Sequence, residues 1–271
     1  MAAAPLPEPP VGSGRYFAWL YTPPPQRRRV QALLGIADEL AASRRPGIDH
    51  QVAHVRLDWW QMEAERLRQG NGSHPLVREL QTGDDTAGLA RSGEELAQLV
   101  QTAVLALAQA RLDPAAATPQ EHALFPAIAA LLTGSPLDAQ QRAVLAAIGD
   151  RVHGLESQSS HATASTGAAT PADRAIVPPA APDDTAVAAP APTPGPATVA
   201  AQATALGQQL QQLTATQRPA LAPLLVWSAV ALRHARRAAA GQRNALSSGI
   251  ADNFLAWRAA RAAARHQLPP L

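Results

Sequence analysis

Apolar residues recur at intervals of three and four through most of the 271-residue chain, and no long segment alternates between apolar and polar residues. The first spacing places apolar side chains on one face of a helix, whereas alternation would place them on one face of a strand. Only 4% of the residues are aromatic, which gives little support to a β-sandwich or barrel. The sequence therefore predicts an all-α fold.

Start and stop signals divide the chain into helices of ordinary length. A helix is predicted from Thr22-Pro23 to a stop before Pro46, the next over about 48–69, and another from the capping pattern of Ser92 with Glu95. The helix over 48–69 carries an apolar stripe that we expect to face the core: Ile48, Val52, Val55, Trp59 and Met62. Two late helices are predicted over about 219–240 and 249–267, the last with helically spaced Ile250, Phe254 and Trp257.

Residues 157–199 differ from the rest of the chain in composition. They are rich in Ala, Pro, Thr and Ser, with eight prolines and no aromatic residue. Because such a stretch buries too little apolar surface to offset the entropy lost on ordering, we expect a disordered linker. It separates an N-terminal helical part, 15–156, from a C-terminal part, 200–268, and we expect the two to pack as one bundle. Residues 1–14 are predicted to be a disordered N-terminus.

All 23 basic residues are arginines, and they are unevenly spread. Residues 200–271 hold eight arginines against one acid, Asp252, whereas residues 46–199 hold nine arginines against 17 acids. The basic region could pair with the acidic one, or it could meet an acidic partner, a diphosphate or an anionic membrane. The net charge of the whole chain is only +2, so we expect no nucleic-acid partner.

Two further features narrow the class of protein. The absence of cysteine excludes a disulfide framework and thiolate metal sites. The longest apolar run, Leu221 to Leu232, is interrupted by Pro223 and is too short to span a bilayer. We therefore expect a cytoplasmic protein that is at most peripheral to a membrane.

Three segments of the N-terminal part form a recognisable set: Tyr16 to Leu40, Val52 to Glu63, and His74-Pro75-Leu76. The second holds an Arg-Leu-x-Trp-Trp sequence that begins at Arg56. Together the segments, within residues 15–80, resemble the squalene/phytoene synthase family. The resemblance implies a reduced terpenoid-synthase-like helical bundle and, for active members, head-to-head condensation of two prenyl diphosphates.

In that family the reaction requires two aspartate-rich helix motifs that hold Mg²⁺, which neutralises the departing diphosphate. At the positions that match the first motif, within 41–45, this chain has two alanines and an arginine, while Asp38 and Glu39 lie out of register. The best match to the second motif, Asp150-Arg-Val-His-Gly154, has glycine where its second aspartate should be. Both halves of the metal clamp are therefore missing from their expected positions.

The loss of both motifs makes the chain similar to a non-catalytic branch of the family, which includes assembly factors for respiratory complex I. The resemblance then implies a catalytically degenerate protein that acts by binding, as in assembly of a respiratory or membrane complex, with no cofactor. A protein partner or a membrane surface is expected, and a prenyl lipid is a further candidate ligand. The alternative is a divergent Mg²⁺-dependent prenyltransferase that uses other carboxylates: Asp38, Glu39, Asp84, Asp85 or Asp150.

Four residues around the double tryptophan are the candidates for a substrate cavity or its vestige: Arg56, Trp59, Trp60 and Glu63. Ordinary packing explains them equally well. No catalytic residue and no metal ligand is predicted.

Three other clusters have competing interpretations. His50, His54 and Asp58 have the helical spacing of a zinc site, but a solvated polar face explains them more simply. The run 27–29 is three arginines that could bind a diphosphate or a partner, against the simpler interpretation of a solvated basic turn. A second basic group either meets an anionic membrane or packs on the acidic N-terminal part: Arg233, Arg236 and Arg237.

Overall fold

The computed structural model describes residues 6–45, 47–112, 123–167, 196–242 and 245–269. Ten α-helices and no strand lie in these ranges, which confirms the predicted all-α fold. In chain order the helices are α1 (Gly14–Leu20), α2 (Pro24–Ala42), α3 (His50–Arg68), α4 (Pro75–Gln81), α5 (Thr86–Leu112), α6 (Leu124–Thr133), α7 (Ala139–Gly167), α8 (Pro196–Gln211), α9 (Ala222–Ala239) and α10 (Ala245–Ala264).

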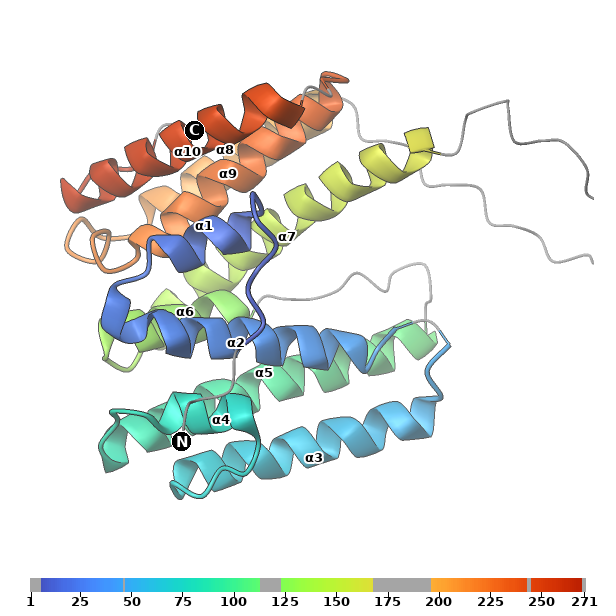
Figure 1. Cartoon of the computed structure of the whole chain (residues 1–271), viewed down its shortest axis with the longest axis vertical. Coiled ribbons are helices and arrows are strands. Elements are labelled where there is room, and N and C mark those ends of the chain that lie inside the picture. Colours follow the sequence, from blue (N-terminus) through green and yellow to red (C-terminus); the bar gives the residue numbers. More distant parts are fainter. Residues whose placement is uncertain (1–5, 46, 113–122, 168–195, 243–244, 270–271) are drawn as a thin grey trace, which may run out of the picture.

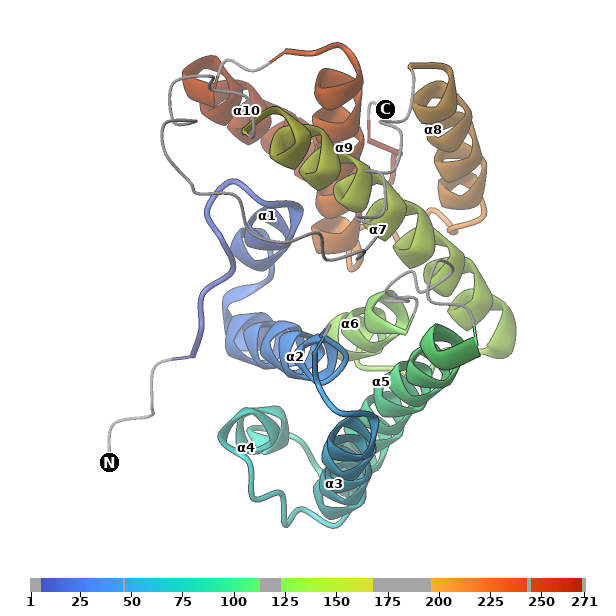
Figure 2. The same cartoon turned by 90° about the vertical axis from the view of Figure 1, so that its right-hand side faces the viewer.

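The helices are stacked along the longest axis of the molecule (Figure 1). Helices α3, α4 and α5 form one end, α2 and α6 the middle, and α1, α8, α9 and α10 the other end, while α7 runs obliquely from the middle to that end (Figures 1 and 2). Helix α6 contacts α2, α5 and α7, and α9 contacts α1, α7, α8 and α10. Helices from before residue 168 and from after residue 195 therefore share one core.

Two helices are apolar on every side, as expected for helices buried within a bundle. Helix α6 buries eight side chains that run around its whole circumference, from Leu124 to Leu132. Helix α9 is buried continuously from Pro223 to Leu232, and it ends with exposed or half-buried arginines. The apolar run from Leu221 to Leu232, which is too short for a bilayer, thus belongs to a core helix.

Helices extend into the predicted linker from both sides. Helix α7 continues to Gly167 and α8 begins at Pro196, so residues 157–167 and 196–199 are helical, while 168–195 lie outside the described residues. The physical reason is that proline, which stops a helix, first occurs in this stretch at Pro171. Pro196 then occupies the first helical position of α8, where proline is tolerated.

Part of the predicted disordered N-terminus is also attached to the fold. The Gln31 side-chain amide donates to the carbonyl oxygens of Leu6 and Pro7, at 3.2 and 3.1 Å. Ser13 caps α1 by accepting from the backbone N–H of Tyr16 at 3.0 Å. Leu6 and Pro7 therefore lie on α2 and Ser13 lies at the start of α1, while residues 1–5 are outside the described part of the chain.

The buried face of α3 is not the predicted one. Four residues of the expected core stripe have between 39% and 67% of their surface exposed: Ile48, Val52, Val55 and Met62. Trp59 is half-buried at the edge of the core. A neighbouring stripe is buried instead: Ala53, Leu57, Trp60, Ala64 and Leu67. Both stripes have helical spacing, but the alanines of the second let α5 approach closely, and that contact decides which face turns inward.

Candidate functional site

The double tryptophan packs around the His-Pro turn rather than around an open space. The Trp59 and Trp60 rings meet edge to face with centroids 5.1 Å apart, and the His74 ring lies 5.7 and 4.9 Å from them. His74 also caps α4, because its Nδ1 accepts from the Leu76 N–H at 3.3 Å. Burial lowers the pKa of His74 despite the carboxylates of Glu39 and Glu63, which favours the neutral ring that this cap needs.

Glu63 is fully buried, and both of its carboxylate oxygens are occupied. Oε1 accepts from the Ser73 hydroxyl at 2.6 Å and from the Arg66 guanidinium at 2.7 Å. Oε2 accepts from the backbone N–H groups of Ser73 and His74, at 2.9 and 3.0 Å. Burial alone would raise the pKa of Glu63, but the hydrogen bonds outweigh burial and lower it to about 2. The carboxylate is thus an ionised anchor for the turn that leads into α4.

Arg56, the fourth candidate, is exposed, and its guanidinium lies 3.8 Å from the Glu39 carboxylate. The structure therefore brings Trp59, Trp60 and Glu63 together with His74 and leaves Arg56 at the surface. These four candidates line none of the pockets described below.

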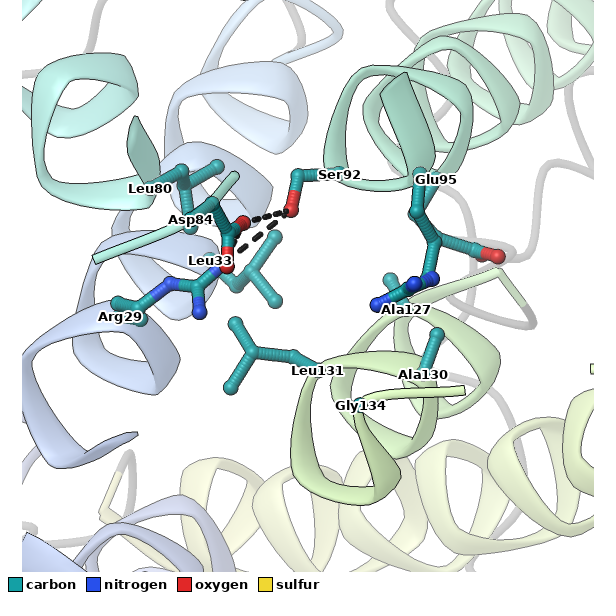
Figure 3. Close-up of a pocket in the computed structure, with 11 residues that line it drawn as sticks. Arg29, Leu33, Leu80, Asp84, Ser92, Glu95, Ala127, Ala130, Leu131 and Gly134 are labelled. Carbon is teal, nitrogen blue, oxygen red and sulfur yellow. Dashed lines mark hydrogen bonds and ion pairs between the residues drawn. The ribbon is translucent and has the colours of Figure 1, made fainter. Parts of the chain in front are cut away.

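A polar pocket lies between α2, α5 and α6 (Figure 3). Arg29 of α2 forms an ion pair with Asp84 and donates to the Ser92 hydroxyl at 3.2 Å, and this hydroxyl donates to Asp84 at 3.0 Å. Glu95 lies across the pocket from Asp84 (Figure 3), and its buried carboxylate accepts two hydrogen bonds from Arg142 of α7, each 2.7 Å long. The cavity volume is about 40 Å³, which is room for a few water molecules or a small ion.

No local sequence pattern predicts this pocket. Helix α5 begins at Thr86 rather than near Ser92, so Ser92 and Glu95 are interior helical residues and not a cap. Asp85 caps the helix instead, because its carboxylate accepts from the Gly88 N–H at 2.7 Å. Arg29 and Asp84 are far apart in the sequence, and no local pattern signals that they meet.

The remaining carboxylates proposed for Mg²⁺ do not converge. Asp38 pairs with Arg15 at the surface, and Glu39 pairs with Arg56. No three residues of the kind that bind metals lie close enough to hold an ion within the described ranges. The Nε2 atoms of His50 and His54 lie 3.0 Å apart, a hydrogen-bonding distance, and Asp58 does not complete a three-residue group with them.

Two wider pockets are open grooves at the surface. One lies between α8 and α9, has a volume of about 550 Å³, and is lined mainly by small apolar residues, with Arg236 at its side. The other lies where α3 begins and α5 ends, near His50 and Arg111, with a volume of about 660 Å³.

Two basic residues of α9, Arg233 and His234, share one partner on α10. Asp252 of α10 accepts from Arg233 Nε at 2.6 Å and lies 3.1 Å from His234 Nε2. Arg233 is therefore paired within the C-terminal part and not with the acidic middle of the chain. Among the described residues, no helix is long and apolar enough to span a bilayer.

Comparison with protein-family models, curated proteins and solved structures found no match to this chain.

Proposed function

We propose that this chain is a catalytically degenerate protein of the squalene/phytoene synthase type, which acts by binding a partner in the cytoplasm or at a membrane surface. The assembly of a respiratory or membrane complex is a role of this kind. The observation that carries the proposal is that three of the five candidate carboxylates are paired with arginines: Asp38 with Arg15, Glu39 with Arg56 and Asp84 with Arg29.

The chemical argument concerns charge. A departing diphosphate must be neutralised by divalent cations, and carboxylates hold those cations by offering free oxygen atoms. An arginine bound to a carboxylate already supplies the positive charge, and a metal ion would have to displace it. The pairs at Asp38 and Asp84 lie at separate places in the bundle. Replacing the arginine of one pair by a metal ion would therefore not place two facing carboxylate groups around one diphosphate.

The size of the polar pocket supports the same proposal, because the two larger spaces, of about 550 and 660 Å³, are open grooves at the surface. Small-molecule sites usually enclose about 300–1,000 Å³. The pocket between α2, α5 and α6, which holds the polar cluster, is far smaller than that, at about 40 Å³. Trp59 and Trp60, the candidates for a prenyl cavity or its vestige, both pack on the His74 ring, which agrees with the alternative of ordinary packing.

Incubation of the purified chain with radiolabelled farnesyl or geranylgeranyl diphosphate and Mg²⁺ tests the proposal. We expect neither a condensed hydrocarbon nor diphosphate above the level of a heat-inactivated sample. Turnover that Asp84→Asn abolishes and Asp58→Asn leaves unchanged would overturn the proposal in favour of the prenyltransferase alternative.

A second candidate function is binding of a prenyl lipid without chemistry, and the groove between α8 and α9 favours it. That groove combines a lining of small apolar residues with the guanidinium of Arg236, the combination that suits an isoprenoid chain with an anionic end. Mass spectrometry of organic extracts from the purified chain would detect such a lipid. Its loss from the Ala203→Trp variant, in which the groove is filled, would assign it to this place.

A further inference from the structure

Helix α10 carries its largest apolar side chains on the outside. Ile250, Phe254 and Trp257 are 80%, 59% and 46% exposed. They follow one another at intervals of four and three, so they form a single stripe along the helix. The opposite face is buried and is made of small residues at the same spacing, Ala256 and Ala263 among them.

The inner face is sufficient to hold α10 in place. Ala256 and Ala259 pack in a cluster with Phe17 of α1 and with the α9 residues Val226 and Val230. The buried Asp252 adds its contacts to Arg233 and His234. The outer stripe is therefore not needed for the attachment of α10 to the bundle.

The outer stripe is accompanied by positive charge. The Arg258 guanidinium lies 5.9 Å from the centre of the Phe254 ring, and that of Arg261 lies 5.2 Å from the Trp257 ring. Arg258 and Arg261 are exposed, as is Arg265 just beyond the helix. The only acid after residue 199 in the sequence is Asp252, which faces inward. The outer face of α10 thus combines aromatic rings with arginines, and no carboxylate of the C-terminal part offsets their charge.

The other exposed apolar stripe has a different electrostatic character. On α3, Val52 and Met62 are exposed beside charges of both signs, the carboxylate of Asp58 and the guanidinium of Arg56 among them. An anionic surface would therefore be attracted more strongly by α10 than by α3. The two helices lie at opposite ends of the long axis, so one end of the molecule is suited to such a surface (Figure 1).

We propose that the outer face of α10 binds an anionic phospholipid surface, with Phe254 and Trp257 at the boundary between headgroups and acyl chains and Arg258 and Arg261 on the phosphates. Aromatic rings are favoured at this boundary, and arginine stems reach from it toward the headgroups. Guanidinium groups bind phosphate oxygens in pairs of hydrogen bonds. This inference identifies the binding partner of the proposed function as a phospholipid surface, and it rests on that proposed function.

Co-sedimentation of the full chain with vesicles tests this inference. We expect the chain to bind vesicles that contain phosphatidylglycerol, to bind pure phosphatidylcholine much more weakly, and to be released by salt. The double variants F254A/W257A and R258E/R261E should each bind at least about tenfold more weakly. Quenching of tryptophan fluorescence by lipids with brominated acyl chains should fall in the Trp257→Phe variant.

Matched variants control for the loss of apolar area and of charge. V55A/M62A removes exposed apolar side chains from α3, and R78E/R111E changes the net charge by the same amount as R258E/R261E. Both should bind the anionic vesicles like the original chain. Circular dichroism and thermal unfolding of each variant verify that the fold is intact.

The inference would be overturned if the α10 variants and the control variants lost vesicle binding equally, or if the original chain did not prefer the anionic vesicles. So would capture of an acidic protein that depends on α10 while vesicles are not bound, because the face would then be a protein-binding site. Failure of the proposed function is a separate result: turnover of prenyl diphosphates would overturn catalytic degeneracy whether or not vesicles bind.

Discussion

Glu63 shows how a single ionised side chain can be retained inside an apolar bundle. Its carboxylate replaces lost water with four donors, three of which come from Ser73 and His74. Such hydrogen bonds favour the charged form more strongly than burial opposes it. The resemblance to a synthase family implied that this residue could line a cavity, whereas its contacts make it an anchor of the turn before α4.

Replacing this carboxylate by an amide should destabilise the protein. We expect Glu63→Gln to lower the free energy of unfolding by about 2–3 kcal/mol, because the amide nitrogen would face groups that are themselves donors. Urea unfolding at neutral pH measures the change. Glu65→Gln, two residues along and exposed, should cost less than about 1 kcal/mol, and an equal loss in both variants would contradict the anchoring role.

The pH dependence of stability should report the same carboxylate. Its pKa is about 2 in the folded chain against an ordinary value of 4.5, so the unfolded chain takes up the proton first as the pH falls. The contribution of Glu63, about 3 kcal/mol, is therefore complete above pH 4.5 and is lost between pH 4.5 and pH 2. Unfolding measured across this window should show a smaller decline for Glu63→Gln than for the original chain, and parallel declines would show that Glu63 is not responsible.

At the scale of the element, the contact between α3 and α5 depends on a missing side chain. A Cβ atom at Gly93 of α5 would lie 2.3 Å from Arg68 Cγ and 2.8 Å from the carbonyl oxygen of Ala64. Because one of these atoms belongs to the backbone of α3, a side-chain rotation alone would not make room. The two helices approach as closely as they do because residue 93 is glycine.

We therefore predict opposite effects for two glycine-to-alanine changes within helices. Gly93→Ala should lower the free energy of unfolding by about 1–3 kcal/mol through overpacking. Gly154→Ala in α7, where a new Cβ would meet no atom within 4 Å, should raise it by about 0.5–1 kcal/mol through helix propensity. Chemical unfolding of both variants provides the comparison, and a stabilising Gly93→Ala would show that α3 and α5 can separate at little cost.

The spacing of apolar residues was enough to predict the helices, but not which face of each helix is buried. Helix α3 has two apolar stripes, and the one that contains Ala53 and Ala64 is buried, whereas Val55 and Met62 of the other are exposed. The same holds for α10, where Phe254 is exposed and Ala259 is buried. The deciding factor is the closeness of the neighbouring helix, which depends on residues distant in the sequence. The pocket at Arg29 and Asp84 could not be predicted for the same reason.

At the scale of the whole molecule, Trp227 joins helices from both sides of the 168–195 segment. This side chain of α9 is buried, and its indole N–H donates to Glu156 of α7 at 2.7 Å. Its ring lies 5.0 Å from that of Phe125 in α6 and 5.8 Å from the Arg15 guanidinium in α1. One residue thus contacts three helices that precede the segment.

We expect Trp227→Ala to lower the free energy of unfolding by about 3–5 kcal/mol, as truncation of a buried aromatic side chain does. Unfolding of the original chain in urea should be a single transition that coincides by far-ultraviolet circular dichroism and by fluorescence, because the core is shared. Two separate transitions, or a loss below about 1 kcal/mol in the variant, would show that the parts before and after the segment fold independently.

The two faces of α10 can change independently of each other. Residues that bear on α9 must stay small, since a larger side chain at Ala256 or Ala259 would push the helix away from Val226 and Val230. Positions 250, 254 and 257 carry no such restriction, because they face outward. Substitutions at these outer positions can therefore change the binding partner of this end of the molecule, in evolution or by design, while the fold of the bundle stays the same.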